Sequence, residues 1–183
     1  TDFDAVTVIK GPQSVMYGPG SAAGVVLFEQ NRTHFSKTQW NSAAVLTLGS
    51  FGRNDQHIVS RAGNPTGYID FAMNRTSADD YSDGNGREIH SQYERWNWRA
   101  SVGWTPLPNL IAELSAIISD GEAAYADRVM DGTKFARSNL GLRIRQDQRV
   151  GIMELFELHV FTNYVDHVMD NFSLRDFQPT AMM

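Results

Sequence analysis

The sequence predicts an all-β protein, an antiparallel meander that forms part of a transmembrane β-barrel. Three observations lead to this prediction. Segments of about ten residues alternate between apolar and polar side chains, tight turns alternate with longer acidic loops, and no stretch is apolar enough for a membrane-spanning helix. Alternate side chains of a strand point to opposite faces of its sheet, and a tilted strand of about 9–11 residues spans a bilayer.

The clearest strand is expected between Tyr93 and Trp104. One set of alternate positions is apolar and the other is cationic or polar: Trp96, Trp98, Ala100, Val102 and Trp104 against Arg95, Asn97, Arg99, Ser101 and Gly103. Such a strand has one apolar face and one polar face. The same pattern recurs, most weakly in 56–62, so that about seven strands are predicted, the others being 40–48, 56–62, 69–76, 110–119, 136–144 and 157–164.

The connections between these segments differ in length. Residues 63–67 and 105–109 contain proline and predict tight turns, whereas 78–91 and 120–133 predict longer acidic loops. Short turns at one end and long loops at the other are typical of an outer-membrane barrel. A soluble antiparallel β-sandwich would show the same alternation of side chains without this asymmetry, and it remains the alternative.

Residues 1–33 differ in character from residues 34–183. The β-branched run Ala5–Ile9 and the apolar run Gly24–Phe28 predict two short buried strands around a compact loop rich in glycine and proline. The glycines between residues 18 and 24 lack the spacing of a phosphate-binding loop, and no Lys-Ser or Lys-Thr pair follows them. Tight packing of the backbone is the better explanation for them.

Composition and motifs exclude several classes of function. The chain has 16 Lys and Arg residues against 21 Asp and Glu residues, and a net charge of −5 makes it a poor candidate for binding nucleic acid. With no cysteine, it has no disulfide, thiolate zinc site or thiol nucleophile. The acidic run Asp79–Gly84 fails the calcium-loop pattern, and Ser14 is not in a nucleophile elbow. We predict no enzymatic activity.

His167 and Met169 are the candidate metal ligands. They share the parity of His159, Phe161, Asn163 and Val165, so a continuous strand places both side chains on its polar face. Their Cα atoms would lie about 7 Å apart, one pleat of the strand. Imidazole and thioether together suit copper, above all Cu(I), but two ligands are too few for a closed site. A chance pair that only lines the polar face is the other interpretation.

Residues Val6–Gly18, VTVIKGPQSVMYG, and Gly20–Val26, GSAAGVV, resemble the signature that closes the plug domain of TonB-dependent outer-membrane receptors. This resemblance implies that residues 1–33 are the C-terminal end of a plug domain. It also implies that residues 34–183 are the first roughly seven strands of a plugged barrel of about 22 strands. The polar face of these strands would line the lumen and hold the plug through Asp70, Arg95, Arg99, Glu113, Arg137 and Arg143.

Four later stretches are similar to the TonB-dependent copper receptor group: 74–81, 93–99, 120–128 and 163–171. In that group a Cys-x-x-x-Met from a plug loop and a His-x-Met from the barrel form the copper site. His167 and Met169 match the second half. The first half would lie upstream of Thr1, and without a cysteine this chain does not complete the site by itself.

The resemblance implies copper uptake across the outer membrane of a Gram-negative bacterium. Copper would be the transported ion, with no organic cofactor. The implied partners are outer-membrane lipid and a TonB-type energy-transducing protein, whose contact segment is not in this chain; nucleic acid is not among them. A receptor for an iron–siderophore or for cobalamin would share the fold and is the first alternative. A β-rich surface protein that transports nothing is the second.

Overall fold

A computed structural model describes residues 5–11, 23–29, 35–147 and 155–177. The chain divides into two compact units, Thr1–His34 and Phe35–Met183. Within the described ranges, no helix has the length and apolar character needed to cross a membrane.

The first unit contains one antiparallel hairpin. Strand β1 (Ala5–Lys10) pairs with β2 (Gly24–Glu29), from Ala5 opposite Glu29 to Lys10 opposite Gly24. Gly24 has φ +138°, and a Cβ there would lie 2.8 Å from the carbonyl oxygen of Ile9, so the close pairing requires glycine. The two predicted strands are confirmed, but the prediction that they are buried is wrong. Val6, Val8, Val26 and Phe28 are exposed and Ile9, Val25 and Leu27 are half-buried, because a two-stranded sheet by itself cannot bury both of its faces.

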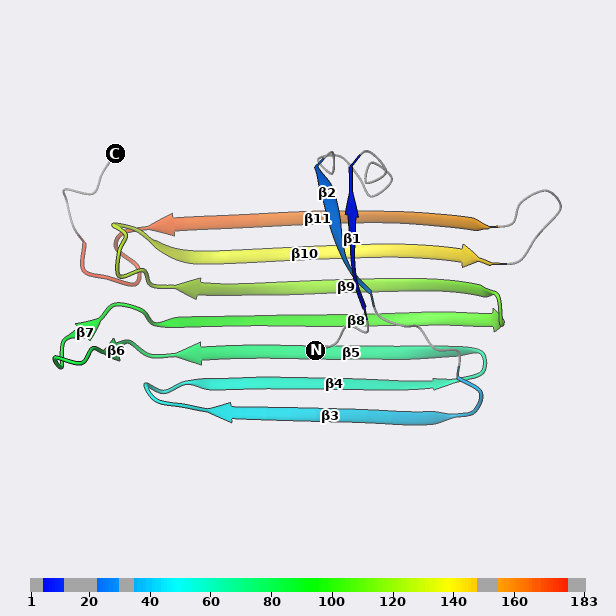
Figure 1. Cartoon of the computed structure of the whole chain (residues 1–183), viewed down its shortest axis with the longest axis horizontal. Coiled ribbons are helices and arrows are strands. Elements are labelled where there is room, and N and C mark those ends of the chain that lie inside the picture. Colours follow the sequence, from blue (N-terminus) through cyan, green and yellow to red (C-terminus); the bar gives the residue numbers. More distant parts are fainter. Residues whose placement is uncertain (1–4, 12–22, 30–34, 148–154, 178–183) are drawn as a thin grey trace. The chain divides into compact units, whose positions relative to one another are not determined.

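The second unit is a seven-stranded antiparallel sheet in which every strand pairs with its neighbours along the chain (Figure 1). The spatial order is β11-β10-β9-β8-β5-β4-β3, a simple meander, and a small hairpin of β6 and β7 is inserted between β5 and β8. The strands are β3 (Gln39–Leu48), β4 (Asn54–Asn64), β5 (Gly67–Ala78), β6 (Tyr81–Ser82), β7 (Glu88–Ile89), β8 (Tyr93–Leu107), β9 (Leu110–Ala123), β10 (Asp131–Gln146) and β11 (Phe156–Asp170). All seven predicted strands are present, and each is longer than predicted, β3 by a single residue.

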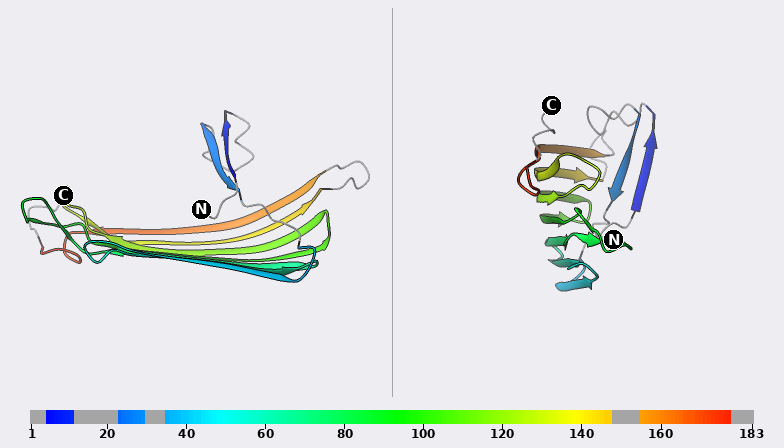
Figure 2. Two further views of the ribbon diagram at one scale, coloured as in Figure 1. Left: turned by 60° about the horizontal axis from the view of Figure 1, so that its bottom comes forward. Right: turned by 90° about the vertical axis from the view of Figure 1, so that its left-hand side faces the viewer.

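The connections agree with the predicted asymmetry only in part, because the nine-residue connection from β10 to β11 lies at the end of the tight turns and the five-residue connection from β3 to β4 lies at the opposite end. Pro65-Thr66 and Pro108-Asn109 make two-residue turns at one end, and the longer connections from β5 to β8 and from β9 to β10 lie at the other end (Figure 1). The predicted loop 120–133 is shorter than expected, because β9 continues to Ala123 and β10 begins at Asp131. The polar residues of this stretch belong to the extended strand ends. The strands of this sheet curve along their length (Figure 2).

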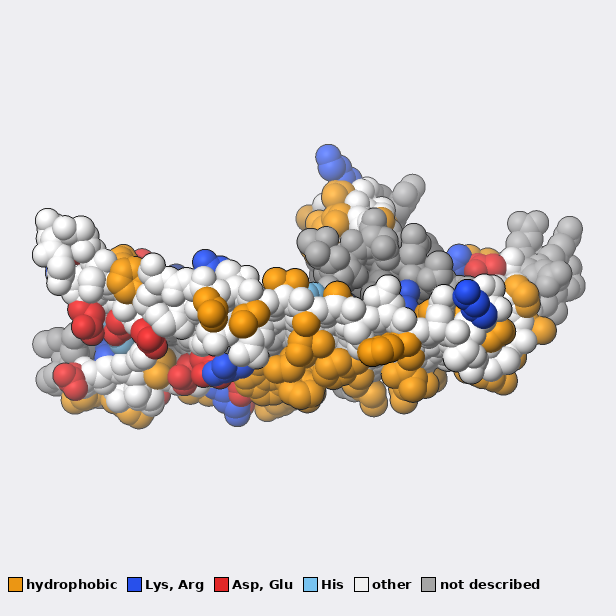
Figure 3. Space-filling model, turned by 90° about the horizontal axis from the view of Figure 1, so that it is seen from below, with side chains coloured by type: hydrophobic (Ala, Val, Ile, Leu, Met, Phe, Trp, Pro, Cys, Tyr) orange, Lys and Arg blue, Asp and Glu red, His pale blue; other side chains and the backbone are white. Residues whose placement is uncertain are grey.

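One face of the sheet is apolar and exposed. Trp40, Val102 and Leu114 lie in one row across the strands and are 73%, 55% and 52% exposed. Hydrophobic side chains gather along one side of the sheet in the space-filling view (Figure 3). A water-soluble domain rarely leaves a continuous apolar surface uncovered. A β-sandwich would cover this face with a second sheet, whereas the described residues of this unit form a single layer apart from the small β6-β7 hairpin.

The height of the apolar face matches a membrane. On β8, Trp96 and Trp104 point to this face eight residues apart, about 26 Å along the strand and about 20 Å across a bilayer at the usual strand tilt. On the loop side of Trp98 the same face turns ionic, with Arg75 paired to Glu94 at 2.9 Å and Lys134 to Asp166 at 2.7 Å. Aromatic residues at both margins of an apolar band about 25 Å high are the pattern of an outer-membrane barrel.

The opposite face is polar and contains buried charged groups. Glu113 is 3% exposed and Asp70 is 8% exposed, while few large apolar side chains among the described residues are buried. This distribution is the reverse of that in a soluble domain, where apolar side chains are buried and charged ones are exposed. It is the distribution expected of a barrel with lipid outside and polar groups inside.

Candidate functional site

The polar face is built from ion pairs and hydrogen bonds between neighbouring strands. Arg61 on β4 makes a two-pronged pair with Asp70 on β5, with one N–O distance of 3.1 Å, and Ser101 on β8 donates to the same carboxylate at 3.4 Å. The Tyr68 hydroxyl donates to Glu113. Charged and neutral hydrogen bonds thus link adjacent and next-nearest strands across this face.

The cationic residues predicted to line this face do so. The register of β5, β8, β9 and β10 places Arg95, Arg99, Arg137 and Arg143 on the face that carries Asp70 and Glu113. Arg143 donates to Glu157 at 2.7 Å, and the guanidinium of Arg95 lies 5.5 Å from the centre of the Tyr93 ring. The face therefore presents positive charge beside aromatic surface.

His167 and Met169 lie near the loop end of β11, on the same polar face as Arg137. The His167 side chain is exposed, and its ring lies 4.8 Å from the ring of Phe135, its partner on β10. Met169 is half-buried opposite Gly132. Strand β11 is at the edge of the described sheet, so both donors have open space beside them.

The described part of the chain brings no further strong ligand to this pair. Among those residues, no three His, Asp or Glu side chains are grouped closely enough to hold a metal ion. An imidazole and a thioether are donors suited to a soft metal ion, but two donors on one edge strand are too few for a closed site.

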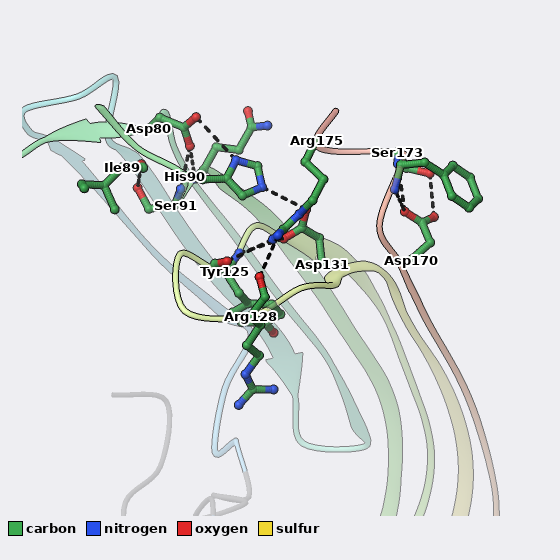
Figure 4. A network of polar contacts seen from close by, with 12 residues as sticks. Asp80, Ile89, His90, Ser91, Tyr125, Arg128, Asp131, Asp170, Ser173 and Arg175 are labelled. Carbon is green, nitrogen blue, oxygen red and sulfur yellow. Dashed lines mark hydrogen bonds and ion pairs between the residues drawn. The ribbon is translucent and has the colours of Figure 1, made fainter. Parts of the chain in front are cut away.

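A second polar centre lies at the loop end of the sheet, around Asp131 (Figure 4). This side chain has 0% exposure. Its carboxylate accepts hydrogen bonds from Arg175 Nε at 2.7 Å and from Arg175 Nη2. It also accepts from the His90 ring at 2.9 Å and from the Tyr125 backbone N–H at 2.9 Å. The buried charge is thus paired and fully hydrogen-bonded, which is the condition under which a buried ion is tolerated.

The same centre joins three segments that are distant in the sequence. Arg175, beyond β11, also donates to the carbonyl oxygens of Arg128 at 2.7 Å and Tyr125 at 3.0 Å in the β9–β10 loop. His90, from the β5–β8 connection, lies between Asp131 and Asp80. This centre was not predicted, because no spacing in the sequence connects His90, Asp131 and Arg175.

The fold and the two faces of the sheet define the class of protein: this is a segment of an outer-membrane β-barrel. The chain matches the solved structure of the copper transporter OprC with a TM-score of 0.87 and 44% sequence identity. The match covers 100% of this chain and 28% of that chain. No protein-family model matches the sequence, and the search of curated proteins found no match.

That transporter is a TonB-dependent outer-membrane receptor, and the chain spans about a quarter of its length. Full coverage of this chain at 44% identity confirms the resemblance of its sequence to that family and the all-β fold. Members of the family are transporters rather than enzymes, and the match indicates the outer membrane of a Gram-negative bacterium.

Proposed function

We propose that this chain is part of a receptor that imports copper across the outer membrane, with His167 and Met169 as its barrel-side copper ligands. The observation that carries the proposal is their geometry. Both side chains project from one face of β11, the face that carries the lumen-type arginines, near the long-loop end of the strand. Imidazole and thioether suit Cu(I), and the similarity to a copper transporter favours the same cargo.

The proposal assigns a role to each part of the chain. Residues 1–33 are the C-terminal end of a plug domain, and residues 34–183 are the first roughly seven strands of the barrel. The division of the structure after His34 supports this boundary. The missing copper ligands come from the plug, and a TonB-type protein drives the plug through segments outside this chain.

The test is Cu(I) affinity in the intact receptor that carries this chain, measured by competition with a chromogenic Cu(I) chelator. Because losing an outer-shell partner of a metal site costs about 10–100-fold in affinity, losing a ligand costs at least about tenfold. We expect such losses for His167→Ala and for Met169→Ala.

The strand offers a matched control. His159 lies on the same strand and face as His167, next to Phe161 and opposite Arg143 near the short-turn end. His159→Ala should therefore leave copper affinity unchanged. Equal affinities for the His167→Ala receptor and the unaltered receptor would overturn the copper site. Binding of a ferric chelate or cobalamin in place of copper would establish the first alternative.

A further inference from the structure

The end of β11 that carries Met169 is fixed by contacts on both of its sides. Met169 pairs with Gly132 on β10, and the last pair of the strand is Asp170 with Asp131. Directly beyond it, the Asp170 carboxylate accepts from the backbone N–H groups of Phe172 at 3.1 Å and Ser173 at 2.9 Å, and from the Ser173 hydroxyl at 2.6 Å. The chain therefore leaves the strand in a defined turn.

That turn places Arg175 beside the buried carboxylate of Asp131. The guanidinium binds both carboxylate oxygens and two backbone carbonyl oxygens of the β9–β10 loop, as Figure 4 shows. A bidentate arginine–carboxylate pair fixes direction as well as distance. Asp131 is the residue before Gly132, so this pair holds the backbone directly opposite Met169.

The pairing next to this position is otherwise weak. The register shifts between Gly132 and Lys134, which leaves Thr133 without a partner residue in the ladder. A strand end next to a bulge separates readily from its partner strand unless the residues that follow it make stabilising contacts. His167 does not depend on this end in the same way, since the Phe135 ring lies 4.8 Å from its own ring.

We propose that Arg175 is the positioning residue for the copper pair: through Asp131 it holds the end of β11, so that the Met169 thioether stays beside the His167 imidazole. Arg175 itself touches no metal. The inference rests on the proposed copper function. It predicts that breaking the Arg175–Asp131 pair moves the Met169 sulfur out of the copper site and leaves the His167 imidazole in place.

The experiment compares Arg175→Gln, Arg175→Lys and Arg145→Gln in the intact receptor. Arg145 is the matched control, because it is also paired with an aspartate, Asp147 at 2.7 Å, but at the opposite end of β10. We expect Arg175→Gln to weaken Cu(I) affinity by about 10-fold or more, in the range of outer-shell losses. Lysine keeps the charge but cannot form the fork, so Arg175→Lys should recover only part of the affinity.

X-ray absorption at the copper edge separates positioning from a general loss of structure. Arg175→Gln should reduce the scattering from sulfur around copper and keep the scattering from imidazole. Arg145→Gln should match the unaltered receptor in affinity and in spectrum.

The outcomes are distinguishable. If His167→Ala binds copper like the unaltered receptor, the copper site is wrong and this inference falls with it. If His167→Ala weakens binding but Arg175→Gln keeps the affinity and sulfur scattering of Arg145→Gln, the copper site stands and only the positioning role is overturned.

Discussion

The Tyr68 hydroxyl on β5 donates a hydrogen bond to Glu113 on β9, although β8 lies between these two strands. The bond is possible because Gly103 on β8 stands between them in the register, and the Tyr68 ring passes over it. A Cβ at Gly103 would lie 2.2 Å from two atoms of that ring. The ring of Phe35 lies over Gly63 in the same way, so two aromatic rings cover glycines along one row of the polar face.

Gly103→Ala should destabilise the sheet by about 1–3 kcal/mol, the cost typical of an added group in a well-packed site. The new methyl group must displace the Tyr68 ring and break its bond to Glu113. Unfolding by urea in detergent, followed through the tryptophan fluorescence, measures this loss. Gly84→Ala is the control, since a Cβ there meets nothing within 4 Å. Equal loss in both variants would contradict the bridging role of Gly103.

Tyr68→Phe should destabilise the barrel by about 1–3 kcal/mol, because it removes a hydrogen-bond donor from the nearly buried carboxylate of Glu113. The ring remains over Gly103, so this change isolates the hydroxyl group. Tyr164→Phe is matched to it, because Tyr164 is 64% exposed on the apolar face. We expect Tyr164→Phe to change the denaturation midpoint only slightly. A loss of stability as large as that of Tyr68→Phe would show that the Tyr68–Glu113 hydrogen bond does not stabilise the barrel.

Leu114→Arg should impair folding into lipid vesicles by about 2–4 kcal/mol, the cost of an arginine at mid-bilayer depth on a barrel's lipid face. Leu114 lies on the apolar face between the rows of Trp96 and Trp104 and is 52% exposed. Glu122→Arg tests the margin of the band on the same strand and face, where we expect about 0–1 kcal/mol. The measurement is urea titration of the vesicle-inserted receptor. Equal losses in the free energy of unfolding at both positions would show that Leu114 does not lie deeper in the bilayer than Glu122.

Acid should weaken the loop end of the sheet in a defined pH window. Burial raises the pKa of Asp131, but the hydrogen bonds from Arg175 and His90 outweigh it and lower that pKa from 3.8 to about 2. Because the folded-state pKa is the lower one, the stabilisation is complete above about pH 4 and is lost as the pH falls toward 2. The same contact raises the pKa of Arg175, which therefore stays charged throughout.

The measurement is the denaturation midpoint between pH 5 and pH 2 for the unaltered receptor and for Asp131→Asn. The asparagine variant should start from a lower midpoint and fall less steeply, because it lacks the titrating carboxylate. Parallel pH curves for the two proteins would show that Asp131 does not contribute to the acid response.

The strands could be predicted from the sequence because each one carries its own evidence. In β8 the alternation of tryptophans with arginines is a local property, and the side-chain period of two is enough to assign both faces. The length of β9 could not be predicted so well. Asp120 and Glu122 look like loop residues in the sequence, but they lie in strand ends that extend past the apolar band, where water solvates their charges.

The meander of about seven two-faced strands, the family resemblance, and the shared parity of His167 and Met169 could all be read from the amino-acid sequence. Each of these follows from short-range order along the chain. The tertiary structure was needed to show that Tyr68 reaches Glu113 across Gly103, and that Arg175 and His90 both bind Asp131. Those contacts join residues 41 to 45 positions apart, and their partners are chosen by strand register and by the need to pair buried charges, which no local pattern records.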